Sequence, residues 1–314
     1  MFKKAAHLFW FVLILLLAFT NITCVSQNNN KAGLTQTAKK YIAFTADTEA
    51  YFCPPSFKSW QGIYTMDIVR ACEKEKVPFT WLVVCDRERQ PREFREIDAM
   101  MKTVWPRRKG IDEFGIHTHF NYFINDTDDE VWKQPERRLA FAKAALARRD
   151  ELGMPAPLSF RYGGGDMQAR FYLDDDLEML HSAGVRNYLL RHKHHLTDFQ
   201  GLAESEIKHL SNNVWQVRDM KDITLLRGPG SNMELPTDEM LARIDTGLAN
   251  ADYIIITCHD YDAAVPANLS AAISHIRAKY NCQFTTITKI GELIRAEKLN
   301  NEFPDNLTNS FSWF

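Results

Sequence analysis

Short apolar runs alternate with amphipathic stretches along most of the chain. The runs YIAFTAD, PFTWLVVC and EFGIHTHF are of strand length and rich in β-branched and aromatic residues. Between them, IYTMDIVRACEKEK and REFREIDAMMKTV repeat their apolar positions with the period of a helix that has one buried face. Strands that alternate with helices in this way predict βα units and a parallel sheet.

The same alternation continues to the end of the domain. Helical periodicity covers the ranges 129–152, 174–183, 237–250 and 268–280. Further strand-like runs are LSFRYGG, NYLLR, NVWQVRD, ITLLRGPG and DYIIITCHD, and the closing segment is QFTTITKIGELIRAEK. About seven or eight strands of this kind predict an α/β barrel or a large, open, doubly wound sheet.

The N-terminal segment differs in composition from this domain. Residues 1–24 contain Lys3 and Lys4, an apolar run from Leu8 to Phe19, and then small and polar residues, which is the layout of a signal peptide or of a lipoprotein signal ending at Cys24. The run is shorter than the ~20 residues that usually cross a bilayer, which favours cleavage or a lipid anchor over a membrane span. We therefore expect an exported protein of the periplasm or cell envelope, with anchorage to a membrane through the N-terminus left open.

The rest of the chain divides by composition. Residues 25–40 are polar without apolar periodicity and indicate a linker, residues 41–299 form the predicted domain, and residues 300–314 indicate a C-terminal tail. A formal net charge of -2 without a basic block argues against a nucleic-acid partner. After Cys24 five cysteines remain, an odd number without C-x-x-C spacing, so neither a disulfide framework nor a thiolate zinc site is expected.

Residues that can carry chemistry follow the predicted strands. They are Asp47 and Glu49 after the first strand, His117 and His119 after the third, Arg161 after the fourth, and His259 after the late apolar strand. Any one of them alone is more often a cap, a turn former or a satisfied polar residue. In an α/β barrel or sheet, however, the carboxyl ends of parallel strands meet at one edge, so these groups should converge.

Two imidazoles and a carboxylate at one edge form a metal site with open positions. Such nitrogen and oxygen ligands suit Zn, Co, Ni, Fe and Mn, and the sequence does not distinguish among these metals. A divalent metal makes water a usable nucleophile near neutral pH. Asp47, left over beside Glu49, is placed to take a proton as general base.

Four motifs occur in the order found in a known family. FTADTE, EFGIHTHF, FRYGGG and IITCHDYD resemble the successive motifs of the polysaccharide deacetylases, carbohydrate esterase family 4, and the resemblance spans about residues 41–293. It implies a deformed (β/α) barrel of about seven strands. It also implies a metal-dependent hydrolase, with zinc as the first candidate metal, that removes N- or O-acetyl groups from a polysaccharide or amino-sugar glycan.

The resemblance also implies a role for each candidate residue. Asp47 corresponds to the catalytic base, Arg161 to the residue that orients this base, and His259 to the general acid. The metal ligands would be Glu49, His117 and His119.

The motifs depart from the family pattern at two points. The family's second histidine stands four residues after the first, whereas this chain has Asn121 there and carries the histidine at position 119. Its usual double aspartate is replaced by Asp47-Thr48-Glu49, so either Asp47 or Glu49 is the ligand and the other the base or a supporting group. Two alternatives stay open: a non-catalytic glycan-binding surface protein on a degenerate barrel, and another metal hydrolase that cuts a linear amide or glycosidic bond.

Overall fold

The structure is a computed structural model that describes residues 38–52, 55, 56, 58, 60–84, 94–118, 135–162, 180–189, 207–211, 214–217, 224–226 and 230–299. The chain divides into two units, Met1–Ala38 and Lys39–Phe314, and the second contains all the described helices and strands. The predicted signal, most of the predicted linker and the predicted tail lie outside the described residues. None of the described helices combines the length and apolar character needed to cross a bilayer.

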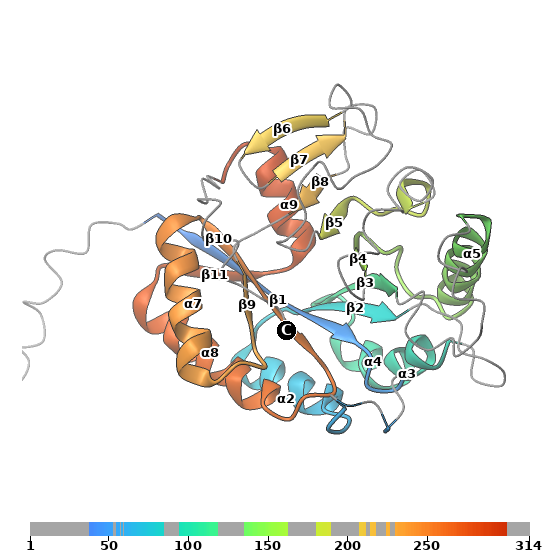
Figure 1. Ribbon diagram of the computed structural model, residues 1–314, viewed down its shortest axis with the longest axis horizontal. Coiled ribbons are helices and arrows are strands. Elements are labelled where there is room, and N and C mark those ends of the chain that lie inside the picture. Colours follow the sequence, from blue (N-terminus) through green and yellow to red (C-terminus); the bar gives the residue numbers. More distant parts are fainter. Residues whose placement is uncertain are drawn as a thin grey trace, which may run out of the picture. The chain divides into compact units, whose positions relative to one another are not determined.

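A curled sheet of eight parallel strands forms the centre of this unit (Figure 1). Their order across the sheet is β8 (Thr224–Leu226), β5 (Asn187–Leu189), β4 (Ser159–Tyr162), β3 (Glu113–Thr118), β2 (Thr80–Val84), β1 (Lys40–Thr48), β10 (Tyr253–His259) and β9 (Gly230–Asn232). Within the described part of the chain β8 and β9 are the two ends of this row, so the barrel is open between them. The predicted α/β barrel is thereby confirmed in its deformed, incompletely closed form.

Three further strands extend the sheet. β7 (Val214–Val217) pairs antiparallel with β8, and β6 (Ile207–Ser211) pairs antiparallel with β7. β11 (Cys282–Thr285) runs parallel to the first half of β1, whereas β2 pairs with its second half. The sequence did not predict β6 or β9, because neither segment has an apolar run.

The described helices of the unit are α2 (Thr65–Glu75), α3 (Arg95–Thr103), α4 (Trp105–Arg108), α5 (Pro135–Glu151), α7 (Thr237–Asn250), α8 (Val265–Lys279) and α9 (Ile287–Arg295). All but the four-residue α4 and the closing α9 overlap segments predicted to be helical, and most of the predicted helix 174–183 lies outside the described residues. Helix α8 packs against both α2 and α7, and the three helices lie outside the curl, while α9 lies near β1, β5 and β8 (Figure 1).

Alternate residues of each strand face opposite sides, which separates two cores. On β1, Ile42, Phe44 and Ala46 face the outer helices and join the larger core. Ala43 faces the barrel interior, where it packs with inward-facing residues of the other strands and with α9. This interior cluster consists of Ala43, Leu82, Leu189, Leu226, Tyr253, Ile255, Ile287, Ile290 and Ile294, all buried.

Gly115 brings β3 close to β4 in this interior. A Cβ atom at this position would lie 2.4 Å from the carbonyl oxygen of Ser159 and 2.7 Å from Cδ2 of Leu82. Since no side chain fits in that space, the glycine permits this close approach of β3 to β4 and to Leu82 of β2, two residues before His117.

Helix α9 closes the amino-terminal end of the barrel. Its first residues contact the starts of β2 and β3: the amide of Ile287 donates to Thr80 Oγ1 (3.2 Å), and the hydroxyl of Thr288 donates to Glu113 Oε1 (2.8 Å). Its last residue, Arg295, donates to Asn187 Oδ1 of β5 (3.0 Å) and to Thr224 Oγ1 of β8 (2.7 Å). The opposite, carboxyl-terminal end of the strands is therefore the end available for a site.

The substitution Ile290→Ala tests whether α9 completes the interior core. Ile290 is fully buried, and removing its side chain should lower the free energy of unfolding by about 2–5 kcal/mol through lost burial and a residual cavity. Urea unfolding followed by tryptophan fluorescence measures the change. The matched control is Ile63→Ala, because Ile63 is 47% exposed and should change stability by at most about 0.5 kcal/mol. Equal effects of the two substitutions would contradict this account of α9.

Candidate active site

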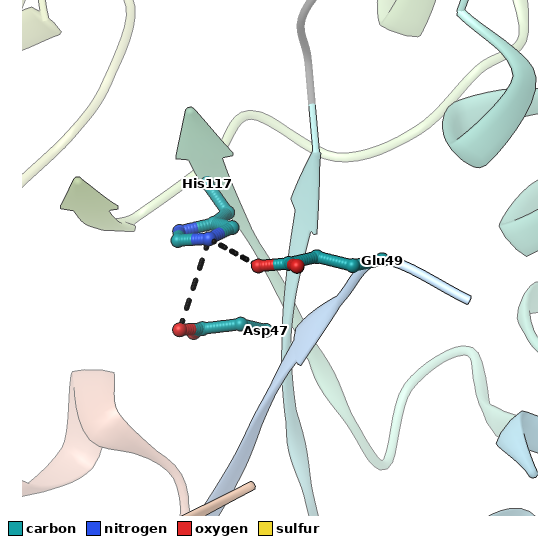
Figure 2. A group of neighbouring side chains, drawn as sticks. All are labelled: Asp47, Glu49 and His117. Carbon is teal, nitrogen blue, oxygen red and sulfur yellow. Dashed lines mark hydrogen bonds and ion pairs between the residues drawn. The ribbon is translucent and has the colours of Figure 1, made fainter. Parts of the chain in front are cut away.

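Three side chains from β1 and β3 meet at the carboxyl-terminal end of the barrel (Figure 2). Asp47 and Glu49 are two residues apart at the end of β1 and point to the same side, toward His117 of β3. One ligand atom from each lies within 4.8 Å of the others, and all three residues are buried. The sequence analysis predicted this convergence of Asp47, Glu49 and His117.

The imidazole of His117 is held from behind by the neighbouring strand. Its Nδ1 lies 3.0 Å from the carbonyl oxygen of Arg161, and because a carbonyl can only accept, Nδ1 must donate. In the neutral ring Nε2 then carries a lone pair, which faces Glu49 Oε1 at 3.0 Å and Asp47 Oδ2 at 3.7 Å. Three acceptors that face one another repel unless a cation, either a proton or a metal ion, lies among them.

These residues fit a divalent metal ion. One nitrogen and two carboxylate ligands match the preferences of Zn, Mn, Fe, Co and Ni, and atoms that share one such ion at about 2.1 Å lie roughly 3 to 3.5 Å apart, close to the spacing around His117 Nε2. A histidine ligand whose other nitrogen donates to a backbone carbonyl is also the usual arrangement at metal sites. The identity of the metal is not fixed by this donor set.

Arg161 lies on the far side of Asp47. Its Nη1 is 3.4 Å from Asp47 Oδ1. Burial by itself would raise the pKa of Asp47, but Arg161, followed by His117 and His259, outweighs it and holds the pKa below its ordinary value. Asp47 is therefore ionised at neutral pH, as a metal ligand or a general base must be.

His259 is adjacent to Asp47 in the register of β1 and β10. Its Nε2 lies 3.8 Å from Glu49 Oε1, and its Nδ1 lies 2.7 Å from Glu234 Oε1, which also accepts from the His259 amide at 2.6 Å. Burial lowers the pKa of His259, but the Glu234 and Glu49 carboxylates outweigh it and raise the pKa to about 10. The Tyr261 ring stacks on the imidazole, with centroids 4.8 Å apart.

Two buried carboxylates lie behind the loop that follows β1. Asp260 accepts from the amides of Glu49 and Ala50, and Glu96 of α3 accepts from the amide of Tyr51. Burial raises the pKa of Asp260 to about 6 and, together with the nearby Asp260 charge, raises that of Glu96 well above its ordinary value. Neither carboxylate belongs to the three-residue cluster around His117 Nε2.

The predicted site residues are thus largely brought together. Asp47, Glu49, His117, Arg161 and His259 converge as expected, while His119 lies outside the described residues. Their individual roles stay predictions, including the choice between Asp47 and Glu49 as ligand.

Sequence reasoning missed Glu234 and Glu96 and gave no role to Asp260. Glu234 stands in the turn between β9 and α7, and Glu96 in the first turn of α3, where an acidic residue is expected in any case. Of the described cysteines, Cys72, Cys258 and Cys282 are free thiols, and Cys258 is buried.

The sequence matches no family model, and no curated protein matches it. Solved structures with a similar fold include a family 4 carbohydrate esterase from Streptomyces lividans in complex with acetate, which is 11% identical, with 85% of this chain and 100% of that one covered and a TM-score of 0.45. A family 4 acetyl xylan esterase from Clostridium thermocellum in complex with cobalt is 17% identical (84% and 100% covered, TM-score 0.40).

A third similar structure is the catalytic domain of a peptidoglycan N-acetylglucosamine deacetylase from Eubacterium rectale. It is 10% identical, with 80% of this chain and 91% of that chain covered and a TM-score of 0.47. Family 4 carbohydrate esterases, whose motifs the sequence resembles, are thus among the solved structures to which this chain is similar.

The contact between Glu234 and His259 predicts that the His259 imidazole is positively charged at neutral pH. A carboxylate favours the protonated imidazole, so in the metal-free protein His259 should stay charged through neutral pH and lose its proton only as the pH rises toward about 10. In Glu234→Gln this support is lost, and the pKa should fall toward the ordinary 6.5. NMR titration of the imidazole measures both values. Glu239→Gln, which changes an exposed residue paired with Arg243, is the control; a Glu234→Gln midpoint equal to that of the control would contradict the assignment.

Proposed function

We propose that this chain is a metal-dependent hydrolase that removes N- or O-acetyl groups from a polysaccharide or amino-sugar glycan. The observation that carries the proposal is the orientation of His117: its Nδ1 donates to the Arg161 carbonyl, and its Nε2 faces the carboxylates of Asp47 and Glu49. A lone pair and two carboxylates that face one another at the open end of the barrel are stabilised by a cation between them. A divalent metal held there supplies Lewis acidity toward an acetyl carbonyl and makes water acidic enough to ionise near neutral pH.

The neighbouring residues suit the two proton transfers of an acetyl hydrolysis. Asp47, with its lowered pKa, is ionised and can take a proton from water, while Arg161 holds its carboxylate in place. His259, with its raised pKa, is protonated and can give a proton to the departing sugar nitrogen or oxygen. A base and an acid on adjacent strands, at one register position, support a hydrolase over a glycan-binding protein without activity.

The ligand set belongs to the proposal as well. Glu49, His117 and His119 are the proposed metal ligands, with zinc as the first candidate metal. The motif resemblance supports an acetylated glycan as substrate, and the apolar N-terminal run supports export to the periplasm or cell envelope, with membrane anchorage of the N-terminus as one form of it.

Metal content tests the site directly. The protein from residue 26 onward should bind about one divalent metal ion per chain, and His117→Ala should not retain it through dialysis, because one of the three proposed ligands is lost. Elemental analysis after metal loading and dialysis gives the stoichiometry. His275→Ala serves as the matched control, since His275 also contacts a carboxylate, Asp245 at 2.8 Å, but lies on α8 outside the site. If His117→Ala retained the same metal content as the wild type, the proposed metal site would be wrong.

Acetate release tests the reaction and the role of Asp47. On oligosaccharides with N-acetyl or O-acetyl groups, release should stop when a chelator removes the metal. Asp47→Asn should keep the metal while kcat/KM falls by about 10²–10⁴-fold, the usual loss when a general base is removed. Loss of metal together with activity would make Asp47 a ligand instead. Binding of glycan without acetate release under any metal loading would favour the non-catalytic alternative.

A further inference from the structure

The backbone just after β1 donates three consecutive amide hydrogens to buried carboxylates from distant parts of the chain. The amides of Glu49 and Ala50 donate to Asp260 Oδ1 at 2.7 and 2.8 Å, and the amide of Tyr51 donates to Glu96 Oε2 at 2.9 Å. Ordinary loops bond their amides to water or to nearby residues. Here the loop that carries Glu49 is fixed from behind by two side chains.

Helix α3 contacts this loop through both backbone polar groups of Tyr51, the amide and the carbonyl. While Glu96 accepts from the Tyr51 amide, Arg95 donates to the Tyr51 carbonyl oxygen at 2.9 Å. Because Arg95 and Glu96 are consecutive in the first turn of α3, a single helix end determines the position of the peptide two residues beyond Glu49.

Asp260 connects the same loop to the strand of the proposed general acid. It directly follows His259, its Oδ2 accepts from the Thr65 hydroxyl at 2.7 Å, and its own carbonyl accepts from the Tyr64 amide at 2.9 Å. Through Asp260 the end of β1, the end of β10 and the start of α2 are joined at one fully buried side chain.

The arrangement is costly for stability. Glu96 is 1% exposed, and its Oε1 atom has no hydrogen-bond partner within the described residues. Two carboxylates packed close to a third, that of Glu49, also repel one another. This cost falls at the loop that carries Glu49, one of the three residues of the cluster around His117 Nε2.

We propose that Glu96 and Asp260 are positioning residues that fix the Glu49 carboxylate against His117 by holding the backbone amides of residues 49–51. This inference rests on the proposed metal-dependent function. Neither residue contacts the metal; each acts through the loop. Removing either should therefore weaken metal binding, and a substitute that retains the acceptor oxygen should restore it.

The test is the affinity for Zn²⁺ alone, measured by competition with a chromophoric chelator. Glu96→Ala and Asp260→Ala should bind Zn²⁺ about 10–100-fold more weakly than wild type, as is typical when a group that orients a ligand is lost. Glu96→Gln and Asp260→Asn keep an oxygen for the loop amides and should stay within about threefold of wild type.

Asp112→Asn is the matched control for a general loss of stability. Asp112 is also a buried carboxylate that accepts from a backbone amide, that of Phe79 at 3.0 Å, but it lies at the opposite, amino-terminal end of β2 and pairs with Arg108. It should lower the free energy of unfolding without a change in Zn²⁺ affinity. If Glu96→Ala does not fold, Glu96→Asp, whose shorter side chain withdraws the acceptor from Tyr51, takes its place.

The outcomes separate this inference from the proposed function. Absence of Zn²⁺ binding by the wild type would overturn both. Wild-type binding with unchanged affinity in the two alanine variants would overturn the positioning role alone. Equal losses in the alanine variants and in Asp112→Asn would also overturn it, because they would reflect stability and not the geometry of the loop.

Discussion

The register of the parallel strands is the constraint on which the site depends. Asp47 is aligned with His259 across β1 and β10, and His117 with Arg161 across β3 and β4. All four are last or nearly last in their strands and share the inward-facing set of alternate positions. If either pairing shifted by one residue, a site residue would face the outer core instead of the barrel interior. Phe44 and Phe160 pack in that outer core.

This alignment concentrates acidic groups at one end of the barrel. In the described part of the chain, Asp47, Glu49, Glu234, Asp260 and Glu96 lie there, with Arg161 and His259 as the positive groups opposite them. Buried charges of one sign are stable only when something compensates them. The raised pKa of His259 and the suitability of the cluster around His117 Nε2 for a cation both follow from the same excess of negative charge.

Much of the fold follows from local patterns. Continuous apolar runs identified β1, β2, β3 and β10, and amphipathic periodicity identified α2, α3, α7 and α8, because these signals are set by burial on one or both sides. The segments of β6 and β9, with sequences IKHLS and GSN, have no such signal, since pairing in the finished sheet makes them strands. The position of β1 between β2 and β10 is likewise a property of the whole chain.

The site also contains residues that were predictable from the sequence and residues that were not. Asp47, Glu49, His117, Arg161 and His259 were predictable because each directly follows or ends an apolar strand, and parallel strands bring such residues to one edge. Glu234 and Glu96 were not, because a glutamate in a turn before a helix, or in the first turn of a helix, has an ordinary local explanation. Contacts that join residues 45 or more positions apart, such as Glu96 with Tyr51, appear only in three dimensions.

The closure of the barrel by α9 has a consequence for the order in which the molecule can be completed. The interior of the sheet is assembled from strands beginning at residue 40, yet its floor is provided by residues 287–295. Because synthesis starts at the amino terminus, this interior is exposed to solvent until α9, the last described helix, has been made and packs against it. Contacts over such sequence separations form slowly, so the interior is expected to be sealed later than the strands around it are paired.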